Sequence, residues 1–207
     1  MSIGPPLRLG FYARDSRRVA GDLIGCRLVR RLDSGVRLVV RIVEVEAYLG
    51  DGSDAASHAH RGPTPRNRTM FGPAGRLYAY RSYGIHTCVN VVCTESGRAA
   101  AVLLRAAEPL EGLCEMRAFR GLRRDASPGL IARGPGRLAQ ALGLELSDDG
   151  RNLLRGGLTL HAPSPDAPRV AVRKGPRIGI TKAAELPYRY FERDSPWVSG
   201  ARPRRER

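Results

Sequence analysis

The chain has 207 residues, a hydrophobic fraction of 42% and a formal net charge of +15. This length and this hydrophobic content fit one globular domain with a real core. The charge favours a polyanionic partner, above all nucleic acid, with a merely solvated basic surface as the alternative. Lys174 and Lys182 are the only lysines, which excludes most mechanisms that use a covalent amine.

The four cysteines and the first residues argue against other classes of protein. Cys26, Cys88, Cys93 and Cys114 form no CxxC pair and have no partners at zinc-ligand spacing. We therefore expect four reduced, mostly buried thiols, and no metal or cofactor. The opening MSIGPPLRLG lacks an apolar run and no stretch reaches membrane-spanning length, so the expected location is the cytoplasm, where bacterial DNA lies.

The N-terminal part is expected to form a short helix and then a hairpin. Residues 1–10 are rich in glycine and proline and should be loose. Asp15 can cap a helix that ends near Gly25. Residues 27–32 and 36–42 flank an Asp-Ser-Gly turn, which predicts an antiparallel hairpin.

The segment RIVEVEAYLG, residues 41–50, places two glutamates in an apolar strand. The apolar residues alternate up to Ile42 and then change phase, which predicts a β-bulge near that residue. Beyond the bulge, Glu44 and Glu46 share one face of the strand. A buried carboxylate is costly unless it is paired or used, so at least one of the two glutamates is expected to have a function.

A turn-rich segment and a tyrosine-rich hairpin follow. Residues 50–75 show no periodicity but contain two histidines and several arginines, and a long loop of this kind is usually functional. Residues 76–92, RLYAYRSYGIHTCVNVV, predict two strands that are interrupted at Ser82-Tyr83-Gly84. Tyr78 and Tyr80 should share a face of the first strand.

The second half of the chain predicts elements of both kinds, namely strands over 100–107, 157–162 and 169–181 and helices over 109–121 and 134–144. The first of these strands holds a single arginine, Arg105. The basic end, residues 201–207, should be loose. With no internal repeat and no second domain, the expected architecture is a single α+β domain over residues 1–207 with several antiparallel strands.

Together these residues suit the hydrolysis of a sugar–base bond in DNA. Aromatic rings can stack on an extruded base, and a tyrosine at a hairpin tip can fill the gap that the base leaves. A carboxylate can activate water for attack on C1′ of the sugar, while a nearby arginine keeps that carboxylate ionised. Each residue also has an ordinary interpretation, as a solvated glutamate, loop histidine, packing tyrosine or structural arginine.

Four segments, RIVEVEAYLG, SHAHRGPTPRNRTMFGPAGRLYAYRSYGIHTCVNVV, VLLRAAEPLEG and SPWVSG, resemble the alkyladenine (3-methyladenine) DNA glycosylase family and follow its order. The resemblance implies one mixed α+β domain with a curved antiparallel sheet, flanking helices and a protruding β-hairpin. It implies a monomer that acts on double-stranded DNA without metal, cofactor or lyase activity. The implied substrates are 3-methyladenine and 7-methylguanine, with hypoxanthine and ethenoadenine as further candidates, and the implied product is an abasic site.

The resemblance also implies roles for individual residues. Glu46 matches the glutamate that deprotonates the attacking water, and Arg105 matches an arginine that helps to hold that water. The implied base pocket consists of Tyr48 on one wall, His58 and Tyr80 on the other, Met70 beside the nucleotide, and Asn90 crowding the amino group of normal guanine. Tyr83 matches the residue that enters the minor groove, and further DNA contacts are expected at Arg66, Ile85, His86, Gly136 and Arg137.

Two other functions and three details stay open. A metal-dependent nuclease would use Glu44, Glu46 and either Asp54 or His58 as ligands. A non-catalytic nucleic-acid-binding protein would use only charge and stacking. Within the leading hypothesis, a loop one residue longer than the family pattern leaves His60 as an alternative to His58. The role of Glu44 and the preferred lesion are also undecided.

Overall fold

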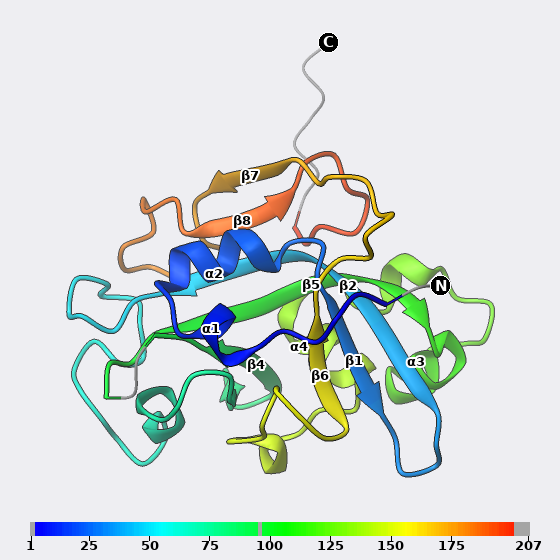
Figure 1. Cartoon of the computed structure of the whole chain (residues 1–207), viewed down its shortest axis with the longest axis horizontal. Helices are drawn as coiled ribbons and strands as arrows, with labels where there is room; N and C mark the ends of the chain where they lie inside the picture. Colours follow the sequence, from blue (N-terminus) through cyan, green and yellow to red (C-terminus); the bar gives the residue numbers. More distant parts are fainter. Residues whose placement is uncertain (1–2, 95–96, 201–207) are drawn as a thin grey trace.

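A computed structural model describes residues 3–94 and 97–200 (Figure 1). Its elements in chain order are α1 (Leu9–Tyr12), α2 (Ser16–Leu23), β1 (Arg27–Arg31), β2 (Arg37–Tyr48), η1 (Arg68–Phe71), β3 (Leu77–Ser82), β4 (His86–Val92), β5 (Ala101–Glu111), α3 (Leu113–Phe119), η2 (Pro128–Leu130), α4 (Pro135–Ala141), η3 (Leu146–Asp148), β6 (Leu158–His161), β7 (Val172–Gly175) and β8 (Arg189–Glu192). This confirms the single α+β domain expected from the sequence.

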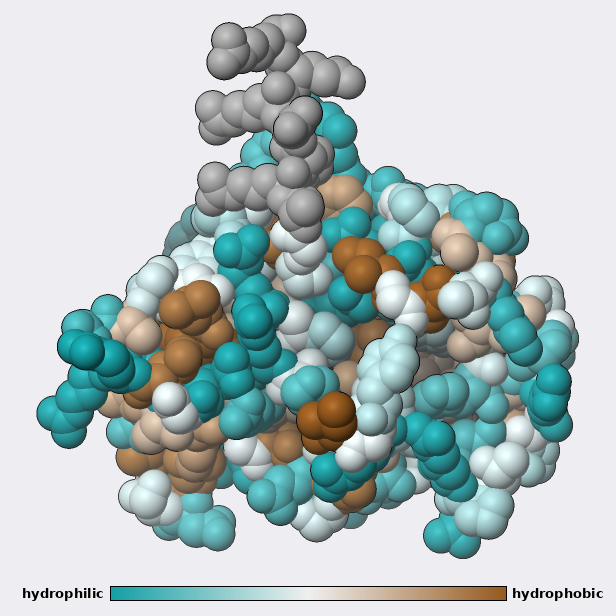
Figure 2. Space-filling view, turned by 180° about the vertical axis from the view of Figure 1, so that it is seen from behind, coloured by the Kyte–Doolittle hydropathy of each residue, from teal (hydrophilic) through white to brown (hydrophobic). Residues whose placement is uncertain are grey.

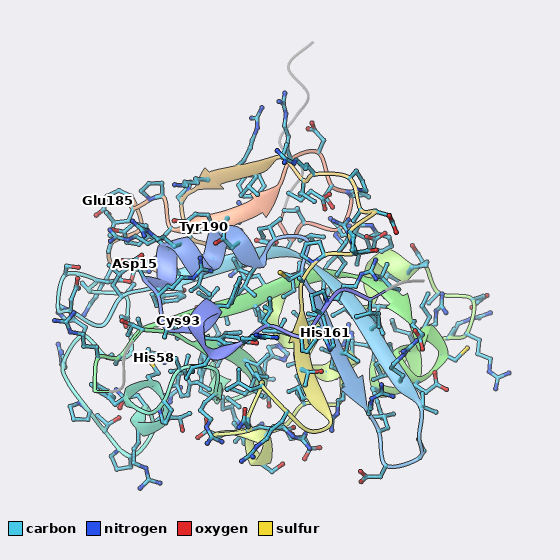
Figure 3. All side chains as sticks on the ribbon, viewed as in Figure 1. Asp15, His58, Cys93, His161, Glu185 and Tyr190 are labelled. Carbon is cyan, nitrogen blue, oxygen red and sulfur yellow. The ribbon has the colours of Figure 1, made fainter. Side chains whose placement is uncertain are left out.

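The strands form one curved antiparallel sheet with the order β3-β4-β5-β2-β1-β6. The β7–β8 hairpin joins the sheet through β8, which pairs with β2 beside Glu44, Val45 and Glu46. In Figure 1 this hairpin lies above α2, and Figure 3 labels Asp15 at the start of that helix and Tyr190 above it, on β8. β2 therefore has β5 along its length and β8 beside its carboxylate-bearing half.

An irregularity in β2 decides which way its side chains point. The pairing of β2 with β5 shifts register between Ile42 and Glu44 and again between Glu44 and Val45. Ile42 belongs to the main core, and the next core residues on this strand are Val45 and Ala47, three and five positions later. One extra residue therefore lies between the two core phases. This confirms the bulge, which places Glu44 and Glu46 together on the opposite face.

The apolar residues form a main core and a small satellite core. The main cluster joins helices α2 and α4 to the sheet through residues such as Leu23, Leu104 and Leu138. The satellite cluster consists of Ala59, Met70, Tyr78, Val92, Ala99 and Ala101. It lies under the 50–75 loop, so this loop has a packed base of its own.

Local signals explain the elements that the sequence predicted correctly. The Asp15 carboxylate accepts a hydrogen bond from the backbone of Arg17 (2.8 Å), which caps α2 as expected. The β1–β2 and β3–β4 hairpins form where the turn residues indicated. Three of the four thiols are buried, while Cys114 is exposed.

Three expectations differ from the structure. Residues 109–111 continue β5 instead of starting a helix, because Pro109 and Glu111 pair with β2; Gly112, at φ 79°, then separates the strand from α3. In the 169–181 segment only Val172–Gly175 is a strand, and β8 was not predicted.

Part of the N-terminal stretch also departs from the expected loose chain. Leu7 donates to the carbonyl of Leu160 (2.8 Å), and Ala162 donates to that of Pro5 (2.9 Å). These bonds hold the start of the chain against β6. The other terminus that we expected to be loose, residues 201–207, lies outside the described residues.

Candidate active site

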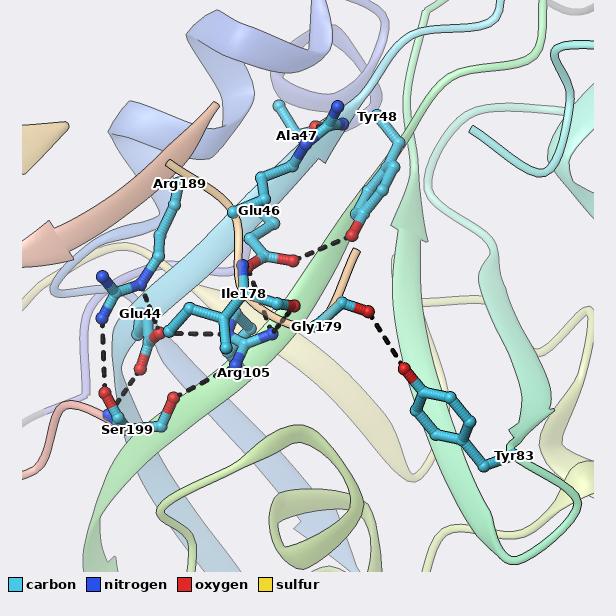
Figure 4. Close-up of polar contacts among 11 residues, drawn as sticks. Glu44, Glu46, Ala47, Tyr48, Tyr83, Arg105, Ile178, Gly179, Arg189 and Ser199 are labelled. Atoms are coloured by element: carbon cyan, nitrogen blue, oxygen red, sulfur yellow. Dashed lines mark hydrogen bonds and ion pairs between the residues drawn. The ribbon is translucent and has the colours of Figure 1, made fainter. Parts of the chain in front are cut away.

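Glu46 is fully buried and yet is bound by Tyr48 of its own strand, by Arg105 of β5 and by Ile178 of the C-terminal segment (Figure 4). Its Oε1 accepts from the backbone amide of Ile178 (2.8 Å) and lies 3.1 Å from Nη1 of Arg105. Its Oε2 accepts from the Tyr48 hydroxyl (2.9 Å). Among the described residues Oε2 thus has one donor where Oε1 has two, so Oε2 has acceptor capacity left for one further group.

Glu44 is equally buried but is held from another side. Its Oε1 accepts from Nε of Arg105 (2.9 Å) and from Nε of Arg189 (2.7 Å), and its Oε2 accepts from the backbone amide of Ser199 (2.6 Å). The two glutamates therefore share Arg105 as a bridge. Glu44 joins the sheet to the C-terminal segment, while Glu46 faces Tyr48.

The ionisation of the neighbouring groups follows from this arrangement. Burial lowers the pKa of the Arg105 guanidinium, but the charges of Glu46 and Glu44 outweigh burial, and the net shift is upward. Burial, together with the charge of Glu46, raises the pKa of the Tyr48 phenol far above neutral pH. Arg105 is therefore cationic, and Tyr48 is a neutral hydrogen-bond donor to the carboxylate.

A cavity of about 240 Å³ lies beside this network. Its lining includes five predicted pocket residues, namely Tyr48, His58, Met70, Tyr80 and Asn90. His60 does not line it. Glu46 and Arg105 are not part of the lining either, so Tyr48 is the link between the cavity and the buried carboxylate. A larger, open concavity of about 700 Å³, over residues 143–151, contains none of the predicted residues.

One wall of the cavity is a packed group of three rings. The rings of Tyr78 and Tyr80 stack at 5.5 Å, and His58 meets Tyr80 edge-on at 4.6 Å. Nδ1 of His58 hydrogen-bonds with the Tyr78 hydroxyl (3.0 Å), and burial raises the pKa of Tyr78 to about 12. The partial burial of His58 and the nearby charge of Arg66 lower the His58 pKa, so this ring is neutral at pH 7.

The rest of the predicted pocket residues are fixed by the same strands and loop. Asn90 is buried, and its amide donates to the Tyr78 carbonyl (3.1 Å) across the β3–β4 pair. Met70 is buried in the satellite core. Arg66 donates to the Arg81 carbonyl (2.7 Å) and lies over the Tyr80 ring. All three line the cavity.

The tip of the β3–β4 hairpin is exposed and apolar. Tyr83 is 81% exposed and Ile85 is 70% exposed. Tyr83 adopts a left-handed φ of 50°, which is unusual for a bulky residue, and Gly84 follows at φ 71°. The Tyr83 hydroxyl donates to the Gly179 carbonyl (3.0 Å; Figure 4), and both residues line the cavity.

The other predicted DNA contacts lie beside this hairpin. A Cβ on Gly136 would lie 2.9 Å from Cβ of His86, so only glycine lets α4 approach β4 this closely. His86 and Arg137 are both exposed, and neither lines the cavity. The structure thus brings Gly136 and His86 into contact. Figure 2 shows that the face opposite to Figure 1 is mostly hydrophilic, with separate apolar patches.

The ligand set proposed for a metal-dependent nuclease does not fit this geometry. Asp54 forms a fully buried pair with Arg177, with two contacts of 2.7 Å, while Glu44 and Glu46 are bound to Arg105. Within residues 3–94 and 97–200, no group of three or more His, Cys, Asp or Glu side chains could hold a metal ion. The carboxylates are thus neutralised by arginines rather than arranged around a cation site.

Sequence reasoning missed the C-terminal contributions to the site. These come from Arg177, Ile178, Gly179, Arg189 and Ser199. The segment SPWVSG, which ends at residue 200, carried a signal for Ser199. The main-chain groups of Ile178 and Gly179 leave no such signal, because any residue type supplies an amide and a carbonyl.

Comparison with known proteins agrees with this site. A family model described as "Methylpurine-DNA glycosylase (MPG)" matches residues 10–196. Three relatives are named "Putative 3-methyladenine DNA glycosylase". The one from Rhodopseudomonas palustris is 48% identical over 98% of this chain and 92% of that protein. The one from Methanoculleus marisnigri is 48% identical over 93% of this chain and 98% of that protein. The one from Chlorobaculum parvum is 47% identical over 94% of this chain and 92% of that protein.

The fold, the aromatic cavity and these matches together define the class of DNA glycosylases. The chain belongs to the methylpurine-DNA glycosylase family. This confirms the resemblance noted in the four sequence segments. In addition, none of the helices within the described residues is long and apolar enough to cross a membrane.

Proposed function

We propose that the protein is a monofunctional DNA glycosylase of base excision repair that flips damaged purines out of duplex DNA and hydrolyses their N-glycosidic bond. The observation that carries the proposal is the Glu46 carboxylate, which is bound to the cationic Arg105 and linked through Tyr48 to an aromatic cavity. Membership of the methylpurine-DNA glycosylase family supports it. The proposed substrates are 3-methyladenine and 7-methylguanine, with hypoxanthine and ethenoadenine as further candidates.

In the proposed reaction, Glu46 is the general base. It removes a proton from a water molecule whose oxygen bonds to C1′, while the C1′–N bond breaks and its electron pair leaves with the purine. A purine that carries a positive charge from alkylation leaves as a neutral base. Arg105 lies 3.1 Å from Glu46, balances its charge and helps to position the water.

The cavity would hold the extruded base between aromatic surfaces. We infer that Tyr48 stacks on one face and His58 and Tyr80 on the other, because these rings come from separate elements and meet around the cavity. Asn90 and Met70 would limit the edges of the base, and Asn90 would crowd the amino group of normal guanine. Of the two histidines, His58 is the better candidate, since His60 does not line the cavity.

The hairpin tip would replace the extruded nucleotide in the duplex. Tyr83 and Ile85 are exposed apolar side chains on a basic protein, as expected for a minor-groove wedge. We infer that Arg66, His86, Gly136 and Arg137 contact the backbone around the wedge. We further propose that the protein acts as a monomer in the cytoplasm. We also propose that it has no lyase activity, because neither lysine lines the cavity.

A comparison of Glu46→Gln with Glu44→Gln tests the proposal. We expect Glu46→Gln to bind a 7-methylguanine duplex but to lose excision by about 10⁴-fold or more, as for an essential catalytic group. Glu44→Gln should retain measurable base release, because Glu44 is bound to Arg189 and Ser199 and does not contact Tyr48 or line the cavity. The matched control is Glu108→Gln, which removes a carboxylate charge from the same β2–β5 pair outside the site.

Released bases are identified by chromatography after incubation with alkylated DNA, with and without EDTA. Normal excision by Glu46→Gln would overturn the assignment of the base. Loss of activity in EDTA would instead point to the nuclease hypothesis.

A further inference from the structure

Arg177 lies next to the pocket with its side chain completely buried. Its guanidinium donates to both oxygens of Asp54 (2.7 Å each) and to the carbonyl of Ala47 (3.0 Å). It also lies over the Tyr48 ring, with Cζ 4.6 Å from the ring centre. The ring that would stack on the base therefore has a fixed cation behind it.

Asp54 connects the two sides of the cavity. Its Oδ2 accepts from the backbone amide of Leu49 (3.1 Å), at the end of the strand that carries Tyr48. Its Oδ1 accepts from the backbone amide of Ala56 (3.1 Å), which lines the cavity two residues before His58. The Asp54–Arg177 pair thus joins the end of β2, which carries Tyr48, to the loop that carries His58.

The residue that follows Arg177 makes the backbone contact with the carboxylate. Ile178 donates its amide to Oε1 of Glu46 (2.8 Å), and its carbonyl accepts from Arg105 (3.5 Å). A shift of Arg177 therefore moves a hydrogen-bond donor to Glu46 as well as the support of Tyr48.

We propose that Arg177 is a positioning residue, paired with Asp54, that sets the width of the base pocket and the alignment of Glu46. This inference rests on the proposed function and deepens it. Arg177 acts through Tyr48, the 50–57 loop and the Ile178 amide.

A pair that served stability alone would be built differently. Nε of Arg177 is buried without a hydrogen-bond partner among the described residues, which is an unfavourable arrangement for a stabilising contact. A buried ion pair can often be replaced by neutral side chains without loss of stability. The pair also contacts both sides of the cavity, through the Tyr48 ring and through the amides of Leu49 and Ala56.

The experiment separates positioning from stability by neutralising both partners. Arg177→Met alone would leave the Asp54 charge buried and unpaired, so the main variant is the double change Asp54→Asn with Arg177→Met. The matched control is Glu111→Gln with Arg37→Met, which neutralises another ion pair of β2 (2.7 Å) outside the site. Arg177→Lys is the conservative variant, because it keeps the charge but loses the two-pronged contact.

Three quantities are measured on a duplex with 7-methylguanine beside 2-aminopurine. These are the thermal unfolding temperature, the 2-aminopurine fluorescence that reports unstacking, and the single-turnover excision rate at saturating enzyme. For the double variant at Asp54 and Arg177 we expect a lower flipping signal and a rate per folded molecule reduced by about 10–100-fold, as for a small misalignment of catalytic groups. The control variant should keep the normal flipping signal and the normal excision rate, and Arg177→Lys should recover part of the rate.

Normal flipping and a normal rate in the double variant would overturn the proposal, and so would equal losses in the Glu111–Arg37 control. Failure of the proposed function is distinguishable, because it would appear as full excision by Glu46→Gln whatever Arg177 does.

Discussion

The end of strand β2 and the tip of the β3–β4 hairpin form the two halves of one site, but they are built in opposite ways. At the strand end, Glu46 and Arg105 are almost fully buried, and Glu46 is bound by Tyr48 of its own strand, by β5 and by the C-terminal segment. At the tip, Tyr83 and Ile85 are exposed, and Tyr83 has a left-handed backbone. One region is enclosed by its surroundings, and the other projects into solvent.

The difference shows how the protein divides its physical requirements. A carboxylate that acts on water gains from fixed donors in a water-poor setting, because fixed donors need no reorganisation during the reaction. A wedge must leave its own protein surface and enter another molecule, so it gains from exposure and few contacts. Four changes test whether stability and activity separate along this line.

The largest effect is expected at the strand end, for Arg105→Gln. This change leaves Glu46 without its arginine and removes one of the two arginines from Glu44. We expect the free energy of unfolding to fall by about 3–5 kcal/mol, as for a broken buried ion pair. Denaturant titration measures this loss, and single-turnover assays should show excision reduced by at least about 100-fold. An unchanged midpoint would contradict the buried network.

Tyr48→Phe removes one hydroxyl and keeps the stacking ring. The hydroxyl donates to Oε2 of Glu46, and a hydrogen bond to a charged group contributes about 1.5–3 kcal/mol. We expect excision to fall about tenfold, with base capture retained, in a comparison of single-turnover rate and 2-aminopurine signal. Loss of the capture signal with an unchanged rate would assign Tyr48 to binding alone.

Tyr83→Asn should weaken the tip without weakening the fold. Asparagine tolerates the left-handed conformation that costs tyrosine about 1–2 kcal/mol, so the unfolding temperature should stay level or rise. Capture of the flipped base should fall about tenfold, a fraction of the few kcal/mol needed to unstack a base. Tyr83→Phe is the matched control, since it keeps the ring but lacks the hydroxyl that binds Gly179. Equal capture by both variants would argue against the wedge.

The smallest effect concerns pH. Burial and the charge of Arg66 lower the pKa of His58 below the ordinary histidine value of about 6.5. The ring is therefore neutral at pH 6.5 and gains its proton only at a lower pH. Capture of a cationic lesion should then weaken by about threefold, because partly exposed charges interact weakly. Binding of 7-methylguanine DNA from pH 8 to 5, compared with His58→Asn, measures this. The variant should lack the drop, and an identical drop in both proteins would remove His58 from the pocket wall.

Much of this division could be predicted from the sequence. The phase change in RIVEVEAYLG placed both glutamates on one face, and the Ser-Tyr-Gly interruption placed Tyr83 at a turn. Side-chain periodicity and turn chemistry are local properties, so they can be read from neighbouring residues. The four family-like segments then supplied the five predicted pocket residues among the twelve that line the cavity.

The contacts from the C-terminal segment could not be predicted in this way. Arg177 reaches Asp54 across 123 positions, and Ser199 reaches Glu44 across 155. β8 is only four residues long and gains its place by pairing with β2. Pattern reasoning also ended β5 too early, because Pro109 and Glu111 extend the strand through pairing with β2 rather than through local preference. Such contacts depend on the assembled sheet.

The alternation that follows the bulge in β2 makes the site sensitive to the length of the chain as well as to its composition. Deleting Val45 would leave every functional residue type in the sequence but would remove the position that separates the two glutamates. Each side chain from Glu46 to Tyr48 would then exchange faces, since side chains alternate strictly along a strand. Glu46 and Tyr48 would turn toward the main core, and Ala47 would turn toward the pocket. At this point a change of one residue in length is more damaging than most changes of residue type.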